Sequence, residues 1–233
     1  MKLDALNRQN QSFAARTLAA HQLQYPSEYV VRFLSSLKTA GDRPKSGLDI
    51  GFGSGQHLQL LMDYGYRASG IELVPEAGDR ARSLFADHPL LGEIVIGDFR
   101  STPFPPSSFD VIICWGVAFL RPLPEIARDL EQIRTLLKPD GHLCINFRTQ
   151  DNWFYGLGDR LDEEHFLLDE RAGAYAGSHY TFLAEATTRQ VMQTAGFAIT
   201  NFERWDWWKN NMKEHHSWWI VWATDRDEER RNG

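Results

Sequence analysis

The sequence predicts a doubly wound α/β fold, in which helices cover both faces of one mostly parallel sheet. Short apolar segments alternate with segments of helical periodicity from residue 46 to residue 147. This alternation is typical of a parallel sheet that is buried on both faces. A glycine-rich turn joins the first apolar segment to the helix after it, as in sheets that bind nucleotide-like ligands at their carboxyl edge. With 233 residues, the chain suits one such domain.

Each expected element follows from local spacing. Before the sheet we expect a weak amphipathic helix over 11–23, and then a helix with Val30, Phe33, Leu34 and Leu37 on one face. The expected strands are 47–51, 68–73, 93–97, 109–115 and 142–147. The helices between them carry Leu58, Leu61 and Met62, then Ala77, Ala81 and Leu84, and then Ile126, Leu130 and Ile133. Gly41-Asp42-Arg43-Pro44 stops the second N-terminal helix, and Pro139-Asp140-Gly141 is expected to turn the chain into the fifth strand.

We expect a single domain over residues 1–233, because the sequence has no repeat and no low-complexity linker. Its parts are N-terminal helices that include a lid (1–45), a ligand-binding core (46–147), an insertion (148–183), a closing helix with a strand pair (184–224) and a frayed tail (225–233). The insertion is aromatic, acidic and Gly-rich, without clear periodicity. In the closing part we expect a helix near 187–195 and strands over 197–206 and 216–224.

The composition disfavours several classes of protein. The formal charge of −6 argues against a phosphate-backbone partner, because affinity for nucleic acid comes mainly from a basic surplus. Cys114 and Cys144 lie in apolar strands outside any Cys/His cluster, so we expect buried thiols and no metal site. No signal peptide is recognisable, and no run reaches the ~20 apolar residues of a membrane helix. We therefore expect a cytoplasmic protein; its oligomeric state stays open.

The stretch Leu48-Asp49-Ile50-Gly51-Phe52-Gly53-Ser54-Gly55 carries most of the information about function. Glycines at alternate positions let the backbone approach a ligand where a Cβ atom would collide. The spacing is GxGxG, whereas a dinucleotide fingerprint would need a third glycine at Gln56. The stretch also lacks the Lys-Ser/Thr ending of a P-loop. A nicotinamide-dependent oxidoreductase is therefore a distant alternative.

Acidic residues end the next two strands. Glu72 ends the second strand, where a carboxylate can accept hydrogen bonds from both hydroxyls of a ribose. Asp98 ends the third strand and precedes Phe99, so a carboxylate and an aromatic ring stand together where an adenine can lie. Each acid alone is explained equally well as a turn or surface residue. Their joint placement at one sheet edge favours a bound nucleoside.

With these residues in place, the segment 46–147 resembles the cofactor-binding core of class I methyltransferases, which use S-adenosylmethionine. The matching pieces are LDIGFGSG (48–55), GIEL (70–73), GDF (97–99), FDVIICWG (109–116) and LLKPDGHLCINF (136–147). The resemblance implies a Rossmann-like sheet of seven strands with an antiparallel last strand. It implies that Asp49 and the backbone of Gly51 and Gly53 hold the amino-acid end of the cofactor, Glu72 the ribose, and Asp98 with Phe99 the adenine. Phe52, Gly55, Leu73 and Trp115 lie in the same motifs and complete the expected cofactor site. Phe52 between the glycines is a mild departure from the commonest pattern.

The expected activity is methyl transfer to O or N of a small polar metabolite, such as a sugar or a sugar-linked intermediate. Methyltransferases that act on amide or base-ring amino groups resemble each other in an Asn/Asp-Pro-Pro-aromatic run, whereas this chain has Cys114-Trp115-Gly116-Val117 there. Two alternatives stay open: aminopropyl transfer from the decarboxylated cofactor, and a noncatalytic subunit that binds S-adenosylmethionine.

For the acceptor we expect a pocket formed by 148–183 and 208–216, because both segments follow strands that end at the ligand edge. His179, Tyr180 and His216 are the candidate general bases, since imidazole titrates near neutral pH. Trp207 or Trp208 is a candidate wall for the acceptor. Arg148 and Lys209 are candidates to hold an anion, although a solvated charge is the simpler interpretation of each. His57 and His88 are expected on the surface.

Overall fold

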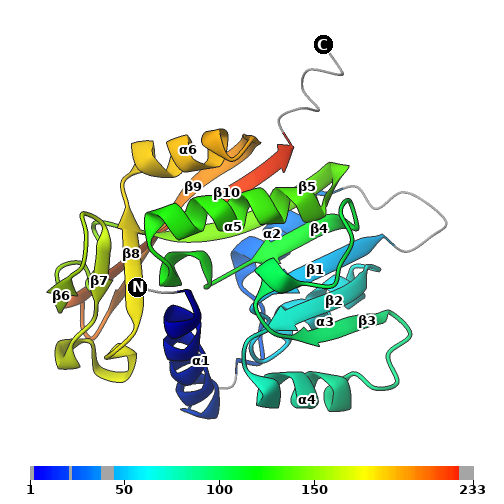
Figure 1. Cartoon of the computed structure of the whole chain (residues 1–233), viewed down its shortest axis with the longest axis horizontal. Helices are drawn as coiled ribbons and strands as arrows, with labels where there is room; N and C mark the ends of the chain where they lie inside the picture. The colour runs from blue at the N-terminus through cyan, green and yellow to red at the C-terminus, as the bar shows by residue number, and fades with distance from the viewer. Residues whose placement is uncertain (1–2, 21–22, 38–44, 226–233) are drawn as a thin grey trace.

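The computed structural model describes residues 3–20, 23–37 and 45–225, and within them it has the predicted α/β fold (Figure 1). Five strands form the centre of the sheet in the order β3-β2-β1-β4-β5, and all of them are parallel. Their bounds are β1 Ser46–Ile50, β2 Arg67–Glu72, β3 Leu91–Ile96, β4 Phe109–Cys114 and β5 Leu137–Thr149. Parallel strands end at one edge, so the residues that follow them come together there.

Helices cover both faces of this sheet, as their apolar spacing predicts. On one face, α2 (Glu28–Ser36), α3 (Gln56–Asp63) and α4 (Pro75–Leu84) pack with the strands in one apolar core. On the other face, α5 (Leu123–Leu136) and α6 (Glu185–Thr194) form a second core. The two thiols, Cys114 and Cys144, are free and buried, as expected.

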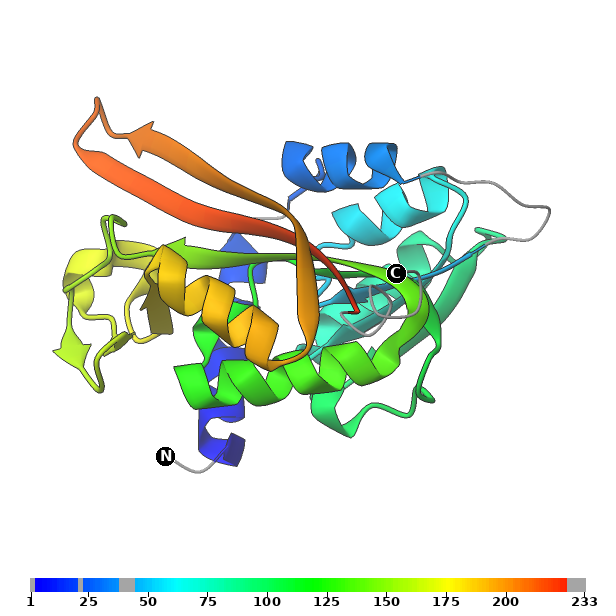
Figure 2. The ribbon, with the colours of Figure 1, turned by 90° about the horizontal axis from the view of Figure 1, so that it is seen from above.

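The last two strands confirm the predicted topology. β10 (Glu214–Asp225) is antiparallel to β5, and β9 (Phe197–Lys209) is antiparallel to β10. β9 therefore runs parallel to the first five strands, and the turn after it lies toward the ligand edge. Figure 2 shows this β9–β10 hairpin extending well beyond the helices. Both strands are longer than expected. Asp225, expected as the first residue of the frayed tail, is the last residue of β10.

The insertion adds strands that the sequence pattern did not predict. It contains β6 (Asp159–Arg160), β7 (His165–Leu167), the 3-10 helix η3 (Glu170–Tyr175) and β8 (His179–Leu183). β8 pairs in parallel with the end of β5, at Arg148 and Thr149, so the described sheet has ten strands instead of seven. Seven buried residues give this part a core of its own: Phe119, Phe154, Phe166, Leu168, Ala172, Tyr180 and Phe182.

Two short 3-10 helices, η1 (Phe99–Ser101) and η2 (Ala118–Leu120), follow β3 and β4 at the ligand edge. Pro139-Asp140-Gly141, expected as a turn before the fifth strand, lies within β5, where the pairing with β4 shifts its register. The expected helix stop at 41–44 and the tail from 226 onward lie outside the described residues.

Helix α1 (Leu3–Ala20) starts earlier than the expected 11–23 and lies across the carboxyl ends of the strands (Figure 1). The Asn7 side chain donates to Asp98 Oδ2 at 2.7 Å, and the Gln11 side chain donates to the Leu73 carbonyl at 2.8 Å. These bonds attach α1 to the loops after β3 and β2. A helix in this position covers the ligand edge; its action as a lid stays a prediction.

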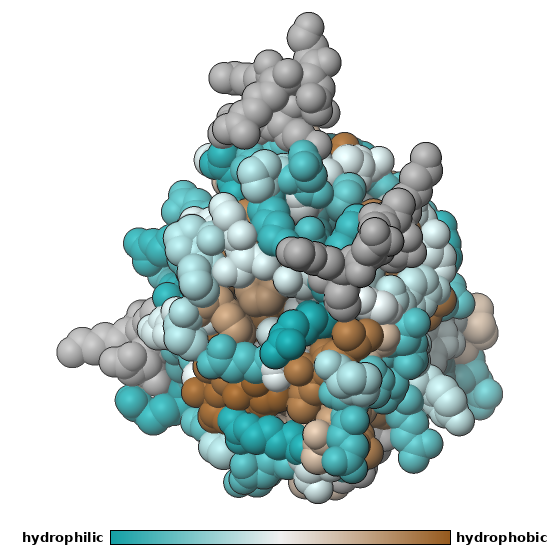
Figure 3. Space-filling model, turned by 90° about the vertical axis from the view of Figure 1, so that its right-hand side faces the viewer, coloured by the Kyte–Doolittle hydropathy of each residue, from teal (hydrophilic) through white to brown (hydrophobic). Residues whose placement is uncertain are grey.

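One face of the molecule is mainly hydrophilic, with a brown apolar area in its lower part (Figure 3). Such a mixture is ordinary for a folded surface. Among the described residues, no helix is long and apolar enough to cross a membrane.

Candidate functional site

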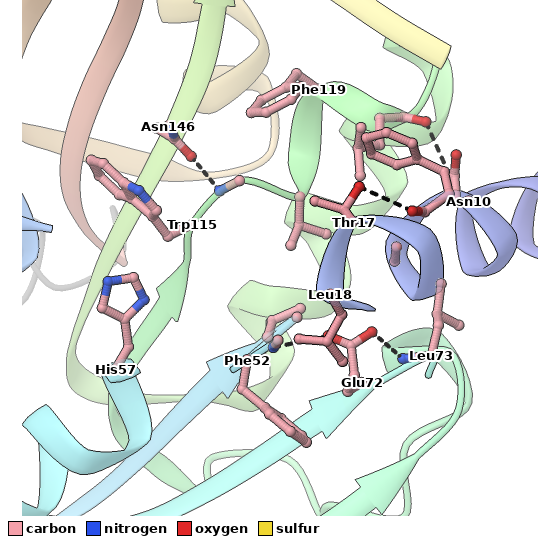
Figure 4. A pocket seen from close by; sticks show the side chains of 18 of the residues that line it. Asn10, Thr17, Leu18, Phe52, His57, Glu72, Leu73, Trp115, Phe119 and Asn146 are labelled. Atoms are coloured by element: carbon pink, nitrogen blue, oxygen red, sulfur yellow. Dashed lines mark hydrogen bonds between the residues drawn. The ribbon is translucent and has the colours of Figure 1, made fainter. Parts of the chain in front are cut away.

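A cavity of about 400 Å³ lies at the carboxyl edge of the sheet, beneath α1. Figure 4 shows Asn10, Thr17 and Leu18 of α1 on one side of it, Glu72 and Phe52 below, and Asn146 and Phe119 above. Its volume falls within the roughly 300–1,000 Å³ of small-molecule sites. The wall continues along β4 and β5 to β8, β9 and β10.

The glycine-rich turn forms the floor of the cavity. Gly51, Gly53 and Gly55 have positive φ values of 71°, 50° and 87°, which side chains rarely adopt. A Cβ atom at Gly51 would also lie 2.3 Å from the Val117 side chain. Gly51 and Gly53 line the cavity, whereas Gly55 lies behind them as the N-cap of α3. The sequence therefore needs glycine here for both the backbone angle and the space.

Glu72 ties the glycine turn to the end of β2. Its Oε2 accepts a hydrogen bond from the Gly53 amide at 3.0 Å, and its Oε1 accepts from the amides of Leu73 and Val74 at 2.7 and 3.2 Å. Burial raises the pKa of Glu72, while these three donors oppose the shift. A carboxylate has about four acceptor sites, so it can still accept from a ligand in the cavity.

Asp98 lies in a buried charge network. Its carboxylate accepts from Asn7, from the Arg100 amide and from the Arg121 guanidinium. Burial alone would raise the pKa of Asp98, but Arg121 and these donors outweigh burial and hold it below its usual value. Arg121 also pairs with Asp129 at 3.3 Å. This network fixes Asp98 beside Phe99, and both residues line the cavity.

Several buried polar atoms around the cavity have no partner in the described structure. They include the amide oxygens of Asn10 and Gln56, which both belong to lining residues, and Oδ2 of Asp49. Asp49 is 1% exposed and lies behind the wall, and burial raises its pKa well above the usual value. Unpartnered acceptors are costly to bury. The two lining oxygens, those of Asn10 and Gln56, suit a ligand that donates hydrogen bonds.

His57 is buried, contrary to the sequence-based expectation. It is 4% exposed, lines the cavity and stands edge-on to Trp115. Its Nε2 accepts a hydrogen bond from the Ser27 amide at 3.2 Å, which requires the neutral ring with the proton on Nδ1. Burial lowers the pKa of His57 to about 4, so the ring stays neutral. The sequence does contain an indication that His57 belongs to the site, because it lies in the first turn of the helix that follows the glycines.

The half of the cavity beyond β4 is aromatic. Trp205 and Trp218 line it and stack with ring centroids 4.3 Å apart. Trp207 and Trp208, the predicted walls, are each 47% exposed and do not line the cavity. Alternation places Trp208 on the other face of β9 from Trp205. Trp207 shares the face of Trp205 but lies two residues further along the hairpin, beyond the cavity.

Of the three candidate bases, only Tyr180 lines the cavity. His179 is buried in a hydrogen-bonded pair with His165, at 2.7 Å, and its other ring nitrogen meets Gln9. His216 lies beside Phe154, and burial lowers its pKa to about 4. Neither histidine reaches the cavity. Sequence reasoning had no means of separating them from Tyr180, because all three follow the same strand-end pattern.

A family model described as a methyltransferase domain matches residues 48–145, which run from within β1 to within β5 and include the glycine turn that forms the floor of this cavity. This segment is a class I methyltransferase domain. The resemblance of its sequence motifs implies S-adenosylmethionine as the cofactor of this domain.

Curated relatives also match through this methyltransferase domain. A sterol 4-C-methyltransferase of Caenorhabditis elegans is 26% identical over 121 residues, which are 51% of this chain and 34% of that protein. A 2-methyl-6-phytyl-1,4-hydroquinone methyltransferase of a Synechocystis species is 30% identical over 99 residues, 42% of this chain and 30% of that protein. The chain thus matches about a third of the length of each.

Solved structures share the fold over most of the chain. A SAM-dependent methyltransferase of Methanosarcina mazei has a TM-score of 0.67 at 18% identity and covers 86% of this chain and 98% of its own. A 1,6-didemethyltoxoflavin-N1-methyltransferase of Burkholderia thailandensis, solved with its acceptor and S-adenosylhomocysteine, has a TM-score of 0.60 at 19% identity; the match covers 78% of this chain and 72% of that one.

The cavity of this methyltransferase domain fits the family's cofactor. Eight of the ten residues expected to hold it line the cavity, and only Asp49 and Gly55 do not. The unpartnered oxygens of Asn10 and Gln56 suit the ammonium of its amino-acid end, which has three donors to place. Glu72 keeps acceptor capacity for ribose hydroxyls. The assignment of each residue to a part of the cofactor stays a prediction.

Proposed function

We propose that this chain transfers a methyl group from S-adenosylmethionine to an oxygen or nitrogen of a small, ring-bearing acceptor. The observation that carries the proposal is a single continuous cavity. One half has the glycine turn, Glu72 and Asp98, and the other half is walled by aromatic rings. Cofactor and acceptor bound in one shared cavity can meet at reacting distance.

The bound cofactor supplies an activated methyl group on a positively charged sulfur. The protein's residues then have to position the acceptor and exclude water, which is worth up to roughly 7–11 kcal/mol of barrier in well-oriented systems. Helix α1 and the β9–β10 hairpin close the cavity from two sides. This enclosure is the main contribution that we assign to the chain.

The lining groups are poor general bases near pH 7. Burial raises the pKa of the Tyr180 hydroxyl to about 12, although the Arg148 guanidinium opposes it, and the pKa of His57 is about 4. A base works best when its pKa lies near the working pH. We therefore assign Tyr180 a positioning role, and we expect an acceptor that is nucleophilic without help from a strong base.

The aromatic walls favour a planar or ring-bearing acceptor over a linear one. Phe13, Phe119, Tyr180, Trp205 and Trp218 all line the cavity. Stacked and edge-on contacts between aromatic rings stabilise a complex in addition to the stabilisation from buried apolar area. The names of the relatives refer to a sterol, a hydroquinone and a toxoflavin precursor, all ring compounds. No particular contact in the cavity favours a sugar, an aminopropyl transfer or a noncatalytic role.

The test is methyl transfer from S-adenosylmethionine labelled in the methyl group. Phenols, hydroquinones and heteroaromatic amines form one panel, and simple sugars form the second. We expect labelled product, with one S-adenosylhomocysteine formed per methyl transferred, from members of the first panel. Cofactor binding without turnover on either panel would contradict the ring-bearing acceptor. No binding of S-adenosylmethionine or S-adenosylhomocysteine would contradict the function itself.

A further inference from the structure

Arg148 is a buried cation that lines the acceptor half of the cavity, and it has no charged partner among the described residues. It follows Asn146 on the same face near the end of β5, and it is 6% exposed. Its Nε and Nη1 have no acceptor in the described structure. Its Nη2 donates only to the Tyr180 hydroxyl, at the long distance of 3.5 Å. The expectation that Arg148 carries a solvated charge is therefore wrong.

Four aromatic rings surround this guanidinium. Its Cζ lies 4.9 Å from the centroid of Phe119, 5.3 Å from Phe154, 4.7 Å from Tyr180 and 4.9 Å from Trp218. Ring faces attract a cation, but they do not neutralise it or satisfy its N–H donors. The rings also cover the flanks of the side chain. A counter-ion can therefore reach Arg148 only from the cavity.

No carboxylate takes this role within the described residues, since the only groups that raise the pKa of Arg148 against burial are Tyr180 and Tyr175. A buried arginine normally finds an acid, and this chain has 31 acidic residues to 25 basic ones. A second cation lies nearby, because the pKa of Lys209 is lowered first by burial and then by the charge of Arg148. Lys209 does not line the cavity, however, and Glu214 opposes the effect of Arg148 on its pKa, so Arg148 is the cation that the acceptor half of the cavity presents.

We propose that Arg148 binds an anionic group of the acceptor, so that the natural substrate is a ring-bearing carboxylate. The guanidinium offers planar, paired donors that match a carboxylate, and the surrounding rings accept the apolar remainder of the molecule. This inference rests on the proposed function, because it names the acceptor's class. It makes Arg148 a specificity-determining residue.

The experiment compares acids with their own amides, which have nearly the same shape and no charge. Benzoate and benzamide, salicylate and salicylamide, and indole-3-acetate and its amide are titrated by calorimetry into protein saturated with S-adenosylhomocysteine. We expect at least one acid to bind tenfold or more tightly than its amide. If every acid binds no better than its amide, the proposal is wrong; this comparison needs no variant.

The variant Arg148→Met then tests whether Arg148 causes the preference for acids over amides. Arg128→Met, on the exposed side of α5, is the matched control. We expect Arg148→Met to lose the acid preference and Arg128→Met to keep it. We also expect the melting temperature of Arg148→Met without ligand to equal or exceed that of the wild type, because the change removes an unpaired buried charge. A preference that survives in Arg148→Met overturns the proposal, as does a marked drop in melting temperature, which would indicate a structural cation.

The affinity for S-adenosylhomocysteine separates this inference from the proposed function. It is expected to be unchanged in Arg148→Met. A tenfold loss would assign Arg148 to the carboxylate of the cofactor and overturn the inference, while cofactor binding by the wild type would leave the proposed function intact. Failure of the wild type to bind S-adenosylhomocysteine would refute the proposed function. The acids and amides can then be titrated into the protein without S-adenosylhomocysteine, so the preference of Arg148 for an anion is tested separately.

Discussion

Replacing Glu72 by Gln tests the predicted ribose contact with little change in shape. Glu72 Oε2 accepts from Gly53, and its Oε1 accepts from Leu73 and Val74. A glutamine has one acceptor oxygen instead of two. Whichever way its amide turns, an NH₂ group faces a backbone N–H donor. The variant therefore loses the negative charge and also loosens the glycine turn.

The size of the effect follows from the bonds involved. A hydrogen bond to a charged group contributes roughly 1.5–3 kcal/mol, and Glu72 has about one acceptor site left for the ribose besides its three backbone donors. Loss of this charged acceptor should cost roughly 1.5–3 kcal/mol of binding free energy, or about 10- to 150-fold in Kd. The unpaired donor at the turn should also lower the free energy of unfolding by roughly 1–3 kcal/mol.

The assay is calorimetric titration with S-adenosylhomocysteine at pH 8. Burial raises the pKa of Glu72, so an alkaline pH is chosen because it favours the ionised carboxylate. Glu76→Gln, an exposed acid in the first turn of α4, is the matched control and should bind like the wild type. A Kd for Glu72→Gln within threefold of the wild-type value, measured on folded protein, would refute the ribose assignment.

Three further predictions follow from the same geometry. Trp205→Ala should raise KM for the acceptor about tenfold and leave the Kd of S-adenosylhomocysteine unchanged. Trp207→Ala, outside the cavity, should change neither value. Equal effects of the two variants in steady-state kinetics would contradict the assignment of Trp205 to the wall of the acceptor half. Because the pKa of His57 is lowered to about 4, the unfolded chain takes up a proton below pH ~6.5 that the folded chain refuses. As the pH falls from 6.5 to 4, this group should therefore remove up to about 1.4 kcal/mol of stability per pH unit, and His57→Gln should flatten that slope in urea unfolding; an unaltered slope would assign the acid sensitivity to other groups. Finally, S-adenosylhomocysteine should slow hydrogen exchange in α1 several-fold more than in α2, because α1 covers the cavity; equal protection of both helices would argue against a lid.

Much of the cofactor half of the site was accessible from the sequence because it depends on local patterns. The glycine turn needs backbone angles that glycine adopts most easily, and it leaves a GxGxG signature. Glu72 and Asp98 end consecutive strands, and parallel strands end at one edge, so their meeting follows from topology alone. The parallel core strands were predicted from the alternation of strands and helices, and the resemblance to class I methyltransferases implied the antiparallel last strand.

The acceptor half was decided by tertiary structure. Trp205 and Trp207 are equivalent in sequence, since they lie two apart on one strand; only the length and exposure of the hairpin place one in the wall and the other in solvent. The strand β8 is short, and its pairing with β5 brings together two segments that β6, β7 and η3 separate in the sequence. That pairing helps to bury Arg148 among rings from four different segments. The sequence by itself determined the fold and the cofactor edge, because repeating local patterns encode them. Whether a charge is solvated or buried without a partner depends on which distant segments close around it, and only the folded chain decides that.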